Sequence, residues 1–344
     1  MRYRFYTTST KAWGAMLAAI GSARESIYLE MYTFHHDIAG YDFLSELERK
    51  AREGVRIVII LDALGSFRFS TIVVDRLRNA GIEVLFFSYW FRRTHRKLLI
   101  IDETIAFLGG VNISNYSARW SDLQIRLAGK RVVQHILRSF ARVYRECGGK
   151  NPALNNRGKL RLFGKTRLWF IEHGMAGKRS AMKRHYIEHI DSARRLIVLI
   201  TPYFMPHHWL IAAVHRAIVR GVVVEIITPR FTDYKIIDRI NSYYFGLFTR
   251  LGAKCYITAK MNHAKVMLID DEAGTVGSQN IDAQSFDWNV ESGVFFDDTK
   301  MVRDLKRIIE SWKRGAVLYN AKEHTPRWYD KLFAFFLRVF EPVL

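Results

Sequence analysis

The chain has 344 residues, 49% of them hydrophobic, which is enough for one large globular domain or two ordinary ones. Its two cysteines, Cys147 and Cys255, exclude a disulfide-stapled scaffold, and no stretch reaches the roughly 18 uncharged apolar residues of a membrane-spanning helix. The formal net charge of +20 predicts an anionic partner, either nucleic acid or an acidic lipid surface.

The first half of the chain is predicted to alternate helices with apolar strands. The N-terminus lacks the pattern of a secretory signal peptide. Residues 19–34 (AIGSARESIYLEMYTF) read as the end of a helix that leads into a β-branched and aromatic strand. Residues 50–62 (KAREGVRIVIILD) and 77–87 (LRNAGIEVLFF) each give a helix end, a helix-stopping glycine and an apolar strand.

The second half repeats these patterns in the same order. The corresponding segments are residues 189–204 (HIDSARRLIVLITPYF), 217–229 (AIVRGVVVEIITP) and 247–257 (LFTRLGAKCYI). Helices that alternate with fully apolar strands indicate a sheet covered on both faces. We therefore predict an α/β fold of two duplicated sandwich units, packed about a pseudo-two-fold axis with the active site at their interface.

The predicted units are residues 1–150 and 165–300. Residues 151–164 are interpreted as a basic linker, and residues 301–344 as a helical, amphipathic segment that associates with a membrane. Residues 126–184 hold 16 Lys or Arg against two acids. This concentration favours an anion-binding surface, and a merely solvated connector is the alternative.

A polar triplet occurs once in each half, on the same apolar run. Residues 94–103 (THRKLLIIDE) and 262–271 (NHAKVMLIDD) both give His-x-Lys-x-x-x-x-Asp. The members are His95, Lys97 and Asp102, then His263, Lys265 and Asp270. Residues two apart share a face of a strand, so each histidine and lysine could meet one phosphate. Each aspartate lies about 16 Å further along the strand, so we assign it to structural pairing at the strand end.

Small polar residues follow each triplet at the same offset. Asn112 in the first half, and Ser278 and Asn280 in the second, are predicted to donate hydrogen bonds to phosphoryl oxygens. A tight turn is the alternative interpretation of these positions. No cluster in the sequence has convincing metal-ligand spacing, so we expect neither a metal nor another cofactor.

Two histidines on opposite sides of one phosphorus permit a two-step displacement. One imidazole attacks and becomes phosphohistidine, while the other protonates the leaving oxygen and then deprotonates the acceptor. Each imidazole needs a carboxylate on its second nitrogen, and the candidates are Asp122 and Glu291 on the next predicted strands. An ordinary acid at a strand end remains an equal alternative for both.

The paired triplets and the following Gly/Ser-x-Asn elements resemble the phospholipase D superfamily and its two HKD motifs. The segments ILDALGS, FRRTHRKLLIIDETIAFLGGVNIS and TPYF are similar to bacterial cardiolipin synthases without N-terminal membrane spans. The resemblance implies transfer of a phosphatidyl group from a donor such as phosphatidylglycerol to the hydroxyl of phosphatidylglycerol. It also implies that all six triplet residues are catalytic, with His95 as nucleophile and His263 as acid/base. The first half departs from the second by having Gly110 where the second has Ser278, and an aspartate as its orienting acid.

The superfamily also contains nucleases, phosphodiesterases and phospholipase D hydrolases, so the substrate needs further observations. On a helix, residues 326–344 (PRWYDKLFAFFLRVFEPVL) would have only a narrow polar stripe, as expected for an interfacial helix or one docked on the protein core. Residues 86–97 (FFSYWFRRTHRK) place five aromatics before four cations, a composition that suits lipid headgroups or stacked bases.

We therefore expect phospholipid substrates and an anionic membrane surface as partners, on the cytoplasmic face of a bacterial inner membrane. Nucleic acid is the partner under the alternative of a nuclease. A catalytically silent binding protein is a third possibility, disfavoured because both triplets are intact. The oligomeric state is not predicted.

Overall fold

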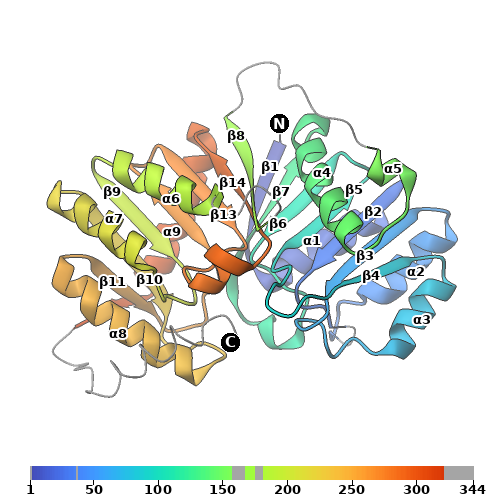
Figure 1. The fold of residues 1–344 in the computed structure, drawn as a ribbon, viewed down its shortest axis with the longest axis horizontal. Coiled ribbons are helices and arrows are strands. Elements are labelled where there is room, and N and C mark those ends of the chain that lie inside the picture. Colours follow the sequence, from blue (N-terminus) through green and yellow to red (C-terminus); the bar gives the residue numbers. More distant parts are fainter. Residues whose placement is uncertain (1, 36–37, 157–166, 175–180, 321–344) are drawn as a thin grey trace. The chain divides into compact units, whose positions relative to one another are not determined.

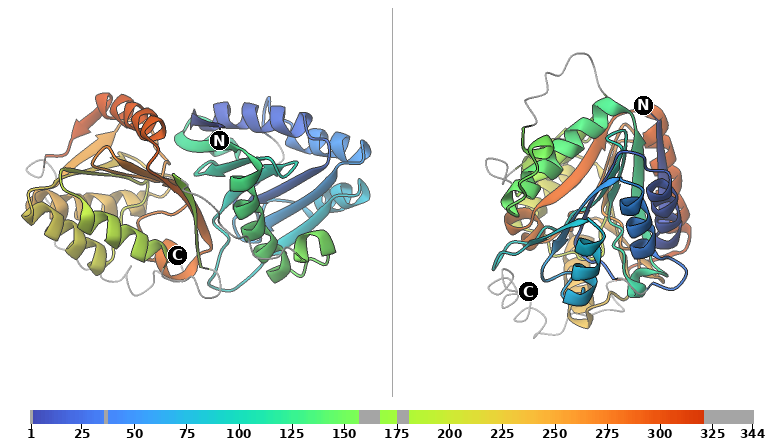
Figure 2. Two further views of the ribbon diagram at one scale, coloured as in Figure 1. Left: turned by 90° about the horizontal axis from the view of Figure 1, so that it is seen from above. Right: turned by 90° about the vertical axis from the view of Figure 1, so that its right-hand side faces the viewer.

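The computed structural model describes residues 2–35, 38–156, 167–174 and 181–320, which form two compact units. Unit 1 comprises Met1–Thr166 together with Val290–Ser292, and unit 2 comprises Arg167–Asn289 and Gly293–Leu344. In each unit a mixed sheet has helices on both faces (Figures 1 and 2). The predicted α/β class and the predicted duplication are both confirmed.

Unit 1 contains a seven-stranded sheet in the order β1-β7-β6-β5-β2-β3-β4. Its strands are β1 (Arg2–Thr8), β2 (Ser26–Met31), β3 (Arg56–Asp62), β4 (Glu83–Phe87), β5 (Lys97–Ile101), β6 (Ile105–Gly109) and β7 (Ser121–Ala128). Its helices are α1 (Ser9–Gly21), α2 (Phe43–Arg52), α3 (Thr71–Asn79), α4 (Lys130–Glu146) and α5 (Pro152–Asn155). Strands β2, β3 and β4 are parallel, and the motif strand β5 is antiparallel to β2.

Unit 2 contains an eight-stranded sheet in the order β15-β11-β10-β9-β12-β13-β14-β8. Its strands are β8 (Leu168–His173), β9 (Leu196–Ile200), β10 (Val223–Pro229), β11 (Lys254–Thr258), β12 (Val266–Ile269), β13 (Ala273–Gly277), β14 (Glu291–Phe296) and β15 (Ala316–Leu318). Its helices are α6 (Ala181–Ser192), α7 (His208–Val219), α8 (Lys235–Leu251) and α9 (Thr299–Arg314). Seven of these strands repeat the order of unit 1, and β15 is added at the β11 edge.

The core of each unit lies between the sheet and three helices. In unit 1, alternate residues of β2 such as Ile27 and Leu29 are buried against α1, α2 and α3. Tyr28, which points to the other face, packs its ring 5.5 Å from that of Phe140 on α4. Strand side chains alternate between the two faces, so a strand with helices on both sides reads as a continuous apolar run.

The motif strand of each unit ends in a tight hairpin. Asp102 and Glu103 between β5 and β6 have φ of 47° and 51°, and Asp270 and Asp271 between β12 and β13 have φ of 53° and 61°. The Thr104 amide donates to the Ile101 carbonyl at 3.0 Å across the first turn. Two consecutive positive φ values define a type I′ turn, whose twist matches antiparallel strands.

The structure corrects the predicted C-terminal boundary at residue 301. Helix α9 begins at Thr299 and buries Met301, Val302 and Leu305 in unit 2, and β15 pairs with β11. Residues 299–318 are therefore part of the second α/β unit. The predicted basic linker, residues 151–164, begins with α5 (Pro152–Asn155), which belongs to unit 1, and its residues 157–164 lie outside the described residues. The predicted interfacial helix 326–344 also lies outside them. Among the described helices, none is long and apolar enough to cross a bilayer.

Candidate active site

His95 lies on the short segment that enters β5 in unit 1. The segment is held by a parallel bridge between Thr94 and Val290. The His95 amide donates to the Val290 carbonyl at 3.0 Å, and the Val290 amide donates to the Arg93 carbonyl at 2.7 Å. Residues 290–292, far away in sequence, thus belong to the unit that carries the first histidine.

Glu291 contacts the His95 imidazole directly. Its Oε1 lies 2.9 Å from His95 Nδ1, and both side chains are buried. A carboxylate can only accept, so Nδ1 carries the proton and donates it to this hydrogen bond. The Nε2 nitrogen of the neutral ring is then left with its lone pair, which is the form that a nucleophile or general base needs.

Lys97 and Tyr32 complete the surroundings of His95. The Lys97 ammonium donates to the His95 carbonyl and lies 5.0 Å from the centre of the Tyr32 ring. The Tyr32 ring is edge-on to His95, with 4.8 Å between ring centres. Lys97 is fully buried, so this ammonium is held in a medium of low polarity close to the imidazole. Tyr32 was not expected from the sequence.

A buried ion pair supports the His95 segment from the sheet. Arg96 donates to Glu30 on β2 at 2.6 Å and to the Ser139 hydroxyl on α4 at 2.7 Å. The Thr94 hydroxyl donates to the other oxygen of Glu30. The side chains of Arg96 and Glu30 are both inaccessible to solvent. Because the residues on either side of His95 share one carboxylate, the backbone of the histidine is fixed from both directions.

Asp62, at the end of β3, fixes the same segment. Its Oδ2 accepts from the Thr94 amide at 2.8 Å, and its Oδ1 accepts from the Leu64 and Gly65 amides. Burial raises the pKa of Asp62 to about 6, against the opposing effect of these backbone donors and of Arg93.

Unit 2 presents the second triplet in a similar way. His263 and Lys265 are buried, and the Lys265 ammonium donates to the His263 carbonyl at 2.6 Å. The Tyr203 ring is edge-on to His263, with 6.3 Å between ring centres. The Tyr203 hydroxyl donates to Asp233 at 2.6 Å. Burial raises the pKa of Asp233, although Tyr203 and the charge of Lys265 oppose the shift. Neither Tyr203 nor Asp233 was expected from the sequence.

Both triplet aspartates bind backbone amides at the far end of the motif strand. The Asp102 carboxylate accepts from the Arg24, Glu25 and Ser26 amides at 2.7–3.1 Å. Asp270 repeats this arrangement with residues 194–196, at 2.7–2.8 Å. The structure therefore brings Lys97 to His95 and places Asp102 at the opposite end of β5, which is the structural role that the strand spacing predicts.

Asp122 and Glu291 occupy equivalent positions of the two sheets. Gly109 pairs with Gln124 in unit 1, and Gly277 pairs with Gly293 in unit 2. Asp122 lies two residues before Gln124, and Glu291 lies two residues before Gly293. The offset between the halves grows from 168 to 169 residues in the preceding loop, where unit 2 has a π-helical turn, Gln284–Trp288. Such turns commonly result from one inserted residue.

Glycine at position 110 is required by the Asp122 side chain. A Cβ at Gly110 would lie 2.2 Å from Asp122 Oδ1, closer than real atoms approach. The second copy has Ser278 at the corresponding position, next to Gly277. The difference between the two copies is thus a steric consequence of where the Asp122 carboxylate lies.

The predicted phosphate-binding amides are buried with unsatisfied atoms. Asn112 and Asn280 are each 5% exposed, and the Oδ1 atom of each has no hydrogen-bond partner in the described structure. Buried polar atoms without partners are rare and commonly await a ligand or water. Ser278 is also buried. The predicted meeting of His95 and His263 at one phosphorus involves both units and stays a prediction.

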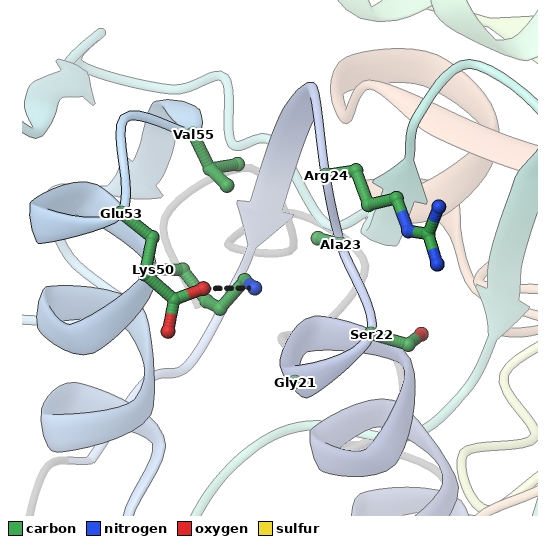
Figure 3. A pocket seen from close by; sticks show the side chains of 7 residues that line it. All are labelled: Gly21, Ser22, Ala23, Arg24, Lys50, Glu53 and Val55. Atoms are coloured by element: carbon green, nitrogen blue, oxygen red, sulfur yellow. Dashed lines mark hydrogen bonds and ion pairs between the residues drawn. The ribbon is translucent and has the colours of Figure 1, made fainter.

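A surface pocket of about 470 Å³ lies away from His95, at the C-terminal ends of α1 and α2 (Figure 3). It is lined by Gly21, Ser22, Ala23, Arg24, Lys50, Glu53 and Val55. The Lys50 ammonium donates to Glu53 at 2.5 Å beside it. Because the Arg24 amide donates to Asp102, the pocket belongs to the Asp102 end of β5.

Comparison with known proteins identifies the family. The family model described as "Cardiolipin synthase, PLD-like domain" matches residues 16–144 and 186–312, once in each half. The cardiolipin synthase of Listeria innocua is 33% identical over 336 residues, which cover 89% of this chain and 68% of that protein. The cardiolipin synthase of Geobacillus kaustophilus is 29% identical over 332 residues, which cover 91% of this chain and 66% of that protein.

The chain thus spans about two thirds of the length of these relatives. Among solved structures, phosphatidylserine synthase of Haemophilus influenzae has a TM-score of 0.76 at 13% identity, over 99% of this chain and 94% of that one. Polyphosphate kinase of Porphyromonas gingivalis has a TM-score of 0.65 at 17% identity, over 100% of this chain and 54% of that one. At such identities these two likenesses concern the fold. The duplicated match to the family model and the two intact triplets together place this chain in the phospholipase D superfamily, in the family of cardiolipin synthase PLD-like domains.

Proposed function

We propose that this protein is a phosphatidyltransferase of the cardiolipin synthase type. It transfers a phosphatidyl group from a phospholipid donor, phosphatidylglycerol, to the hydroxyl of a second phosphatidylglycerol, on an anionic membrane surface. The observation that carries the proposal is the hydrogen bond between Glu291 and His95 Nδ1, which prepares Nε2 as a nucleophile. The similarity to curated cardiolipin synthases supports the choice of substrate.

In the first step, His95 Nε2 attacks the donor phosphorus and the P–O bond to the headgroup breaks. His263 gives its proton to the departing glycerol oxygen, and a phosphatidyl-histidine forms. In the second step, His263 takes the proton of the acceptor hydroxyl, whose oxygen displaces His95. Glycerol is released and cardiolipin is formed, so atoms and charges balance without an added reductant or oxidant.

Charged and amide groups stabilise the phosphorane-like transition state in this proposal. Lys97 and Lys265 supply positive charge, and Asn112, Asn280 and Ser278 supply hydrogen-bond donors. The amide groups of the two asparagines can turn to present nitrogen to a phosphoryl oxygen. By its equivalence in strand register to Glu291, Asp122 is assigned the task of orienting His263.

The test is a product analysis with purified protein. Vesicles containing phosphatidylglycerol are incubated with the wild type, His95→Ala and His263→Ala, and cardiolipin, glycerol and phosphatidic acid are quantified. We expect equal amounts of cardiolipin and glycerol from the wild type and neither product from the two variants. Phosphatidic acid as the main product would identify a hydrolase, and cleavage of single-stranded DNA with inert lipid would identify a nuclease.

A second measurement examines the intermediate. The reaction is quenched with alkali after one turnover of donor labelled in the phosphatidyl group, because phosphohistidine survives base and is lost in acid. We expect label on the wild-type chain and none on His95→Ala. Label retained by His95→Ala and lost by His263→Ala would exchange the roles of the two histidines.

A further inference from the structure

Two neighbouring loops of unit 1 expose large apolar side chains. Residues 63–70 follow β3, and residues 88–96 follow β4. Leu64 is 54% exposed and Phe67 71% exposed on the first loop, and Ile72 at the start of α3 is 78% exposed. On the second loop, Tyr89 is 43% exposed and Trp90 89% exposed. These five residues are called the apolar patch below.

The two loops leave the sheet at the same edge. Strands β3 and β4 are parallel neighbours, so their carboxyl ends lie side by side (Figure 1). The pairing continues past the strands, because the Ala63 amide donates to the Phe87 carbonyl at 3.0 Å. The apolar patch is therefore assembled from two segments that are more than 15 residues apart in sequence.

The same edge of the sheet carries His95. The Ser66 hydroxyl of the first loop donates to the Tyr32 carbonyl at 2.8 Å, and the Tyr32 ring lies edge-on to His95. The second loop itself contains Thr94 and His95. The first loop is thus linked to the candidate nucleophile through Tyr32, and the second loop carries the nucleophile itself.

Arginines accompany the aromatic side chains on both loops. The Arg68 guanidinium lies 5.5 Å from the centre of the Phe67 ring, and that of Arg92 lies 5.5 Å from the centre of the Tyr89 ring. Tryptophan and tyrosine are enriched at the headgroup level of bilayers, where arginine also binds lipid phosphate. Exposed clusters of large apolar side chains are uncommon on proteins that remain in water, and they commonly mark a binding surface.

We propose that the apolar patch enters the headgroup layer of an anionic phospholipid bilayer and thereby presents His95 to lipid phosphate. This inference rests on the proposed function, because a phospholipid donor keeps its acyl chains in the bilayer while its phosphorus reaches the histidine. The apolar side chains leave water on insertion, and the Arg68 guanidinium remains at the depth of the phosphates, whereas Arg92 is ion-paired with Glu146 at 3.0 Å.

The first experiment measures vesicle binding by the full chain. Phe67→Ser/Trp90→Ser is compared with the wild type by co-sedimentation with phosphatidylglycerol/phosphatidylcholine vesicles, and thermal unfolding verifies that the variant is folded. Val219→Ser/Val317→Ser is the matched control, since these two valines are 73% and 72% exposed in unit 2. We expect binding to weaken at least tenfold in the patch variant and less than twofold in the control. Equal binding by all three proteins overturns the proposal.

The second experiment measures insertion of one side chain. Fluorescence of wild type and Trp90→Phe is recorded on vesicles whose lipids carry bromine at a shallow acyl position. The difference between the two proteins isolates Trp90 from the other tryptophans, and we expect this component to be quenched. An unquenched Trp90 component excludes insertion.

Both experiments are repeated on a His95→Ala background, which we expect to make no product. Loss of binding in the patch variant on this inactive background supports the inference even if lipid turnover by the wild type fails. If light scattering shows that the patch variant dissociates a wild-type oligomer while vesicle binding is kept, the patch joins copies of the chain and the inference is wrong.

Discussion

Glu291 Oε1 lies 2.9 Å from His95 Nδ1, and this hydrogen bond joins residues 196 positions apart. Replacing the carboxylate with an amide removes the negative charge and introduces an NH2 donor, which can face Nδ1 and stabilise the wrong ring tautomer. We expect Glu291→Gln to lower kcat by about 10²- to 10⁴-fold with little change in the unfolding temperature. Steady-state cardiolipin formation and thermal unfolding measure the two effects. Glu53→Gln, at a half-exposed surface position, is the control, and an equal loss of activity there would contradict the assignment.

Asp102 is expected to stabilise the fold more than it assists the reaction. In Asp102→Ala, three backbone amides lose their acceptor, and the type I′ turn gains a residue that disfavours positive φ. We expect a loss of about 2–4 kcal/mol in the free energy of unfolding by urea. Asp102→Asn keeps an acceptor and tolerates positive φ, so it should retain most of the stability. A large activity loss in Asp102→Asn at unchanged stability would contradict the structural role.

Asp270 also stabilises the fold, and its contribution to the free energy of unfolding depends on pH. Burial alone would raise the pKa of Asp270, but three backbone donors and Arg195 hold it below its ordinary value. The stability from this carboxylate is present above its unfolded pKa near 3.8 and is lost as the pH falls through the lower folded pKa.

The contact between Gly110 and Asp122 can be tested by a double-mutant cycle. A methyl group at position 110 would displace the Asp122 carboxylate, so we expect Gly110→Ala to lower kcat by about 10- to 100-fold. When Gly110→Ala is added to Asp122→Ala, we expect little further loss of kcat, because the Asp122 carboxylate that the methyl group would displace is already absent. Gly14→Ala is the control, since a Cβ there meets no atom within 4 Å. Additive effects of the two changes would show that Gly110 acts independently of Asp122.

For the buried ion pair of Glu30 and Arg96, we expect that removing one charge lowers the free energy of unfolding far more than replacing both charges. Arg96→Ala leaves the Glu30 carboxylate buried without its cation, which we expect to cost about 3–5 kcal/mol in unfolding free energy. Glu30→Leu/Arg96→Met replaces both charges by apolar groups and should recover most of that loss. Arg307→Ala, which breaks an exposed pair with Asp304, is the comparison and should cost under about 1 kcal/mol. A double variant as unstable as Arg96→Ala would argue against this explanation.

His185 makes unit 2 sensitive to acid. Burial, with a smaller effect of His189, lowers the pKa of His185 to about 3. Between about pH 6.5 and 3 the unfolded chain binds a proton that the folded chain does not, so this residue lowers stability by about 1.4 kcal/mol per unit of falling pH. We expect His185→Gln to flatten the pH dependence of urea unfolding in that range. His215→Gln, at an exposed position, should leave the slope unchanged, and equal slopes for all three proteins would contradict the prediction.

The class and duplication of the fold follow from the sequence, because hydrophobic periodicity and glycine placement report local structure directly. The direction of the motif strands does not follow from them. β5 and β12 run antiparallel to β2 and β9, and strand direction is set by how elements pack in three dimensions. The extent of unit 2 was missed for a similar reason, since nothing in AVL distinguishes a short edge strand such as β15 from a loop.

The candidate site was predictable where the two halves repeat each other. Both histidines, both lysines and the acid Glu291 are singled out by the sequence because the repeat makes a weak pattern specific. The buried pair of Glu30 and Arg96 has no counterpart in the second half, where Ile200 and Ala264 stand. Tyr32 and Tyr203 both lie edge-on to their histidine, but from positions that differ by one residue in the repeat. A signal for Glu30 was nevertheless present, since it is the one charge in the apolar strand SIYLEM, and a buried charge needs an opposite one. Arg96 stands among other cations, so its sequence context does not single it out.

Residues 290–292 have a consequence for how the chain is made. A ribosome releases the His95 region early, yet the carboxylate that sets its tautomer is added almost 200 residues later, so a nascent or truncated first half holds an unprepared imidazole. In a protein with only one copy of the motif, the equivalent of Glu291 would have to come from a second molecule. Gene fusion would have placed the histidine and this acid on one chain.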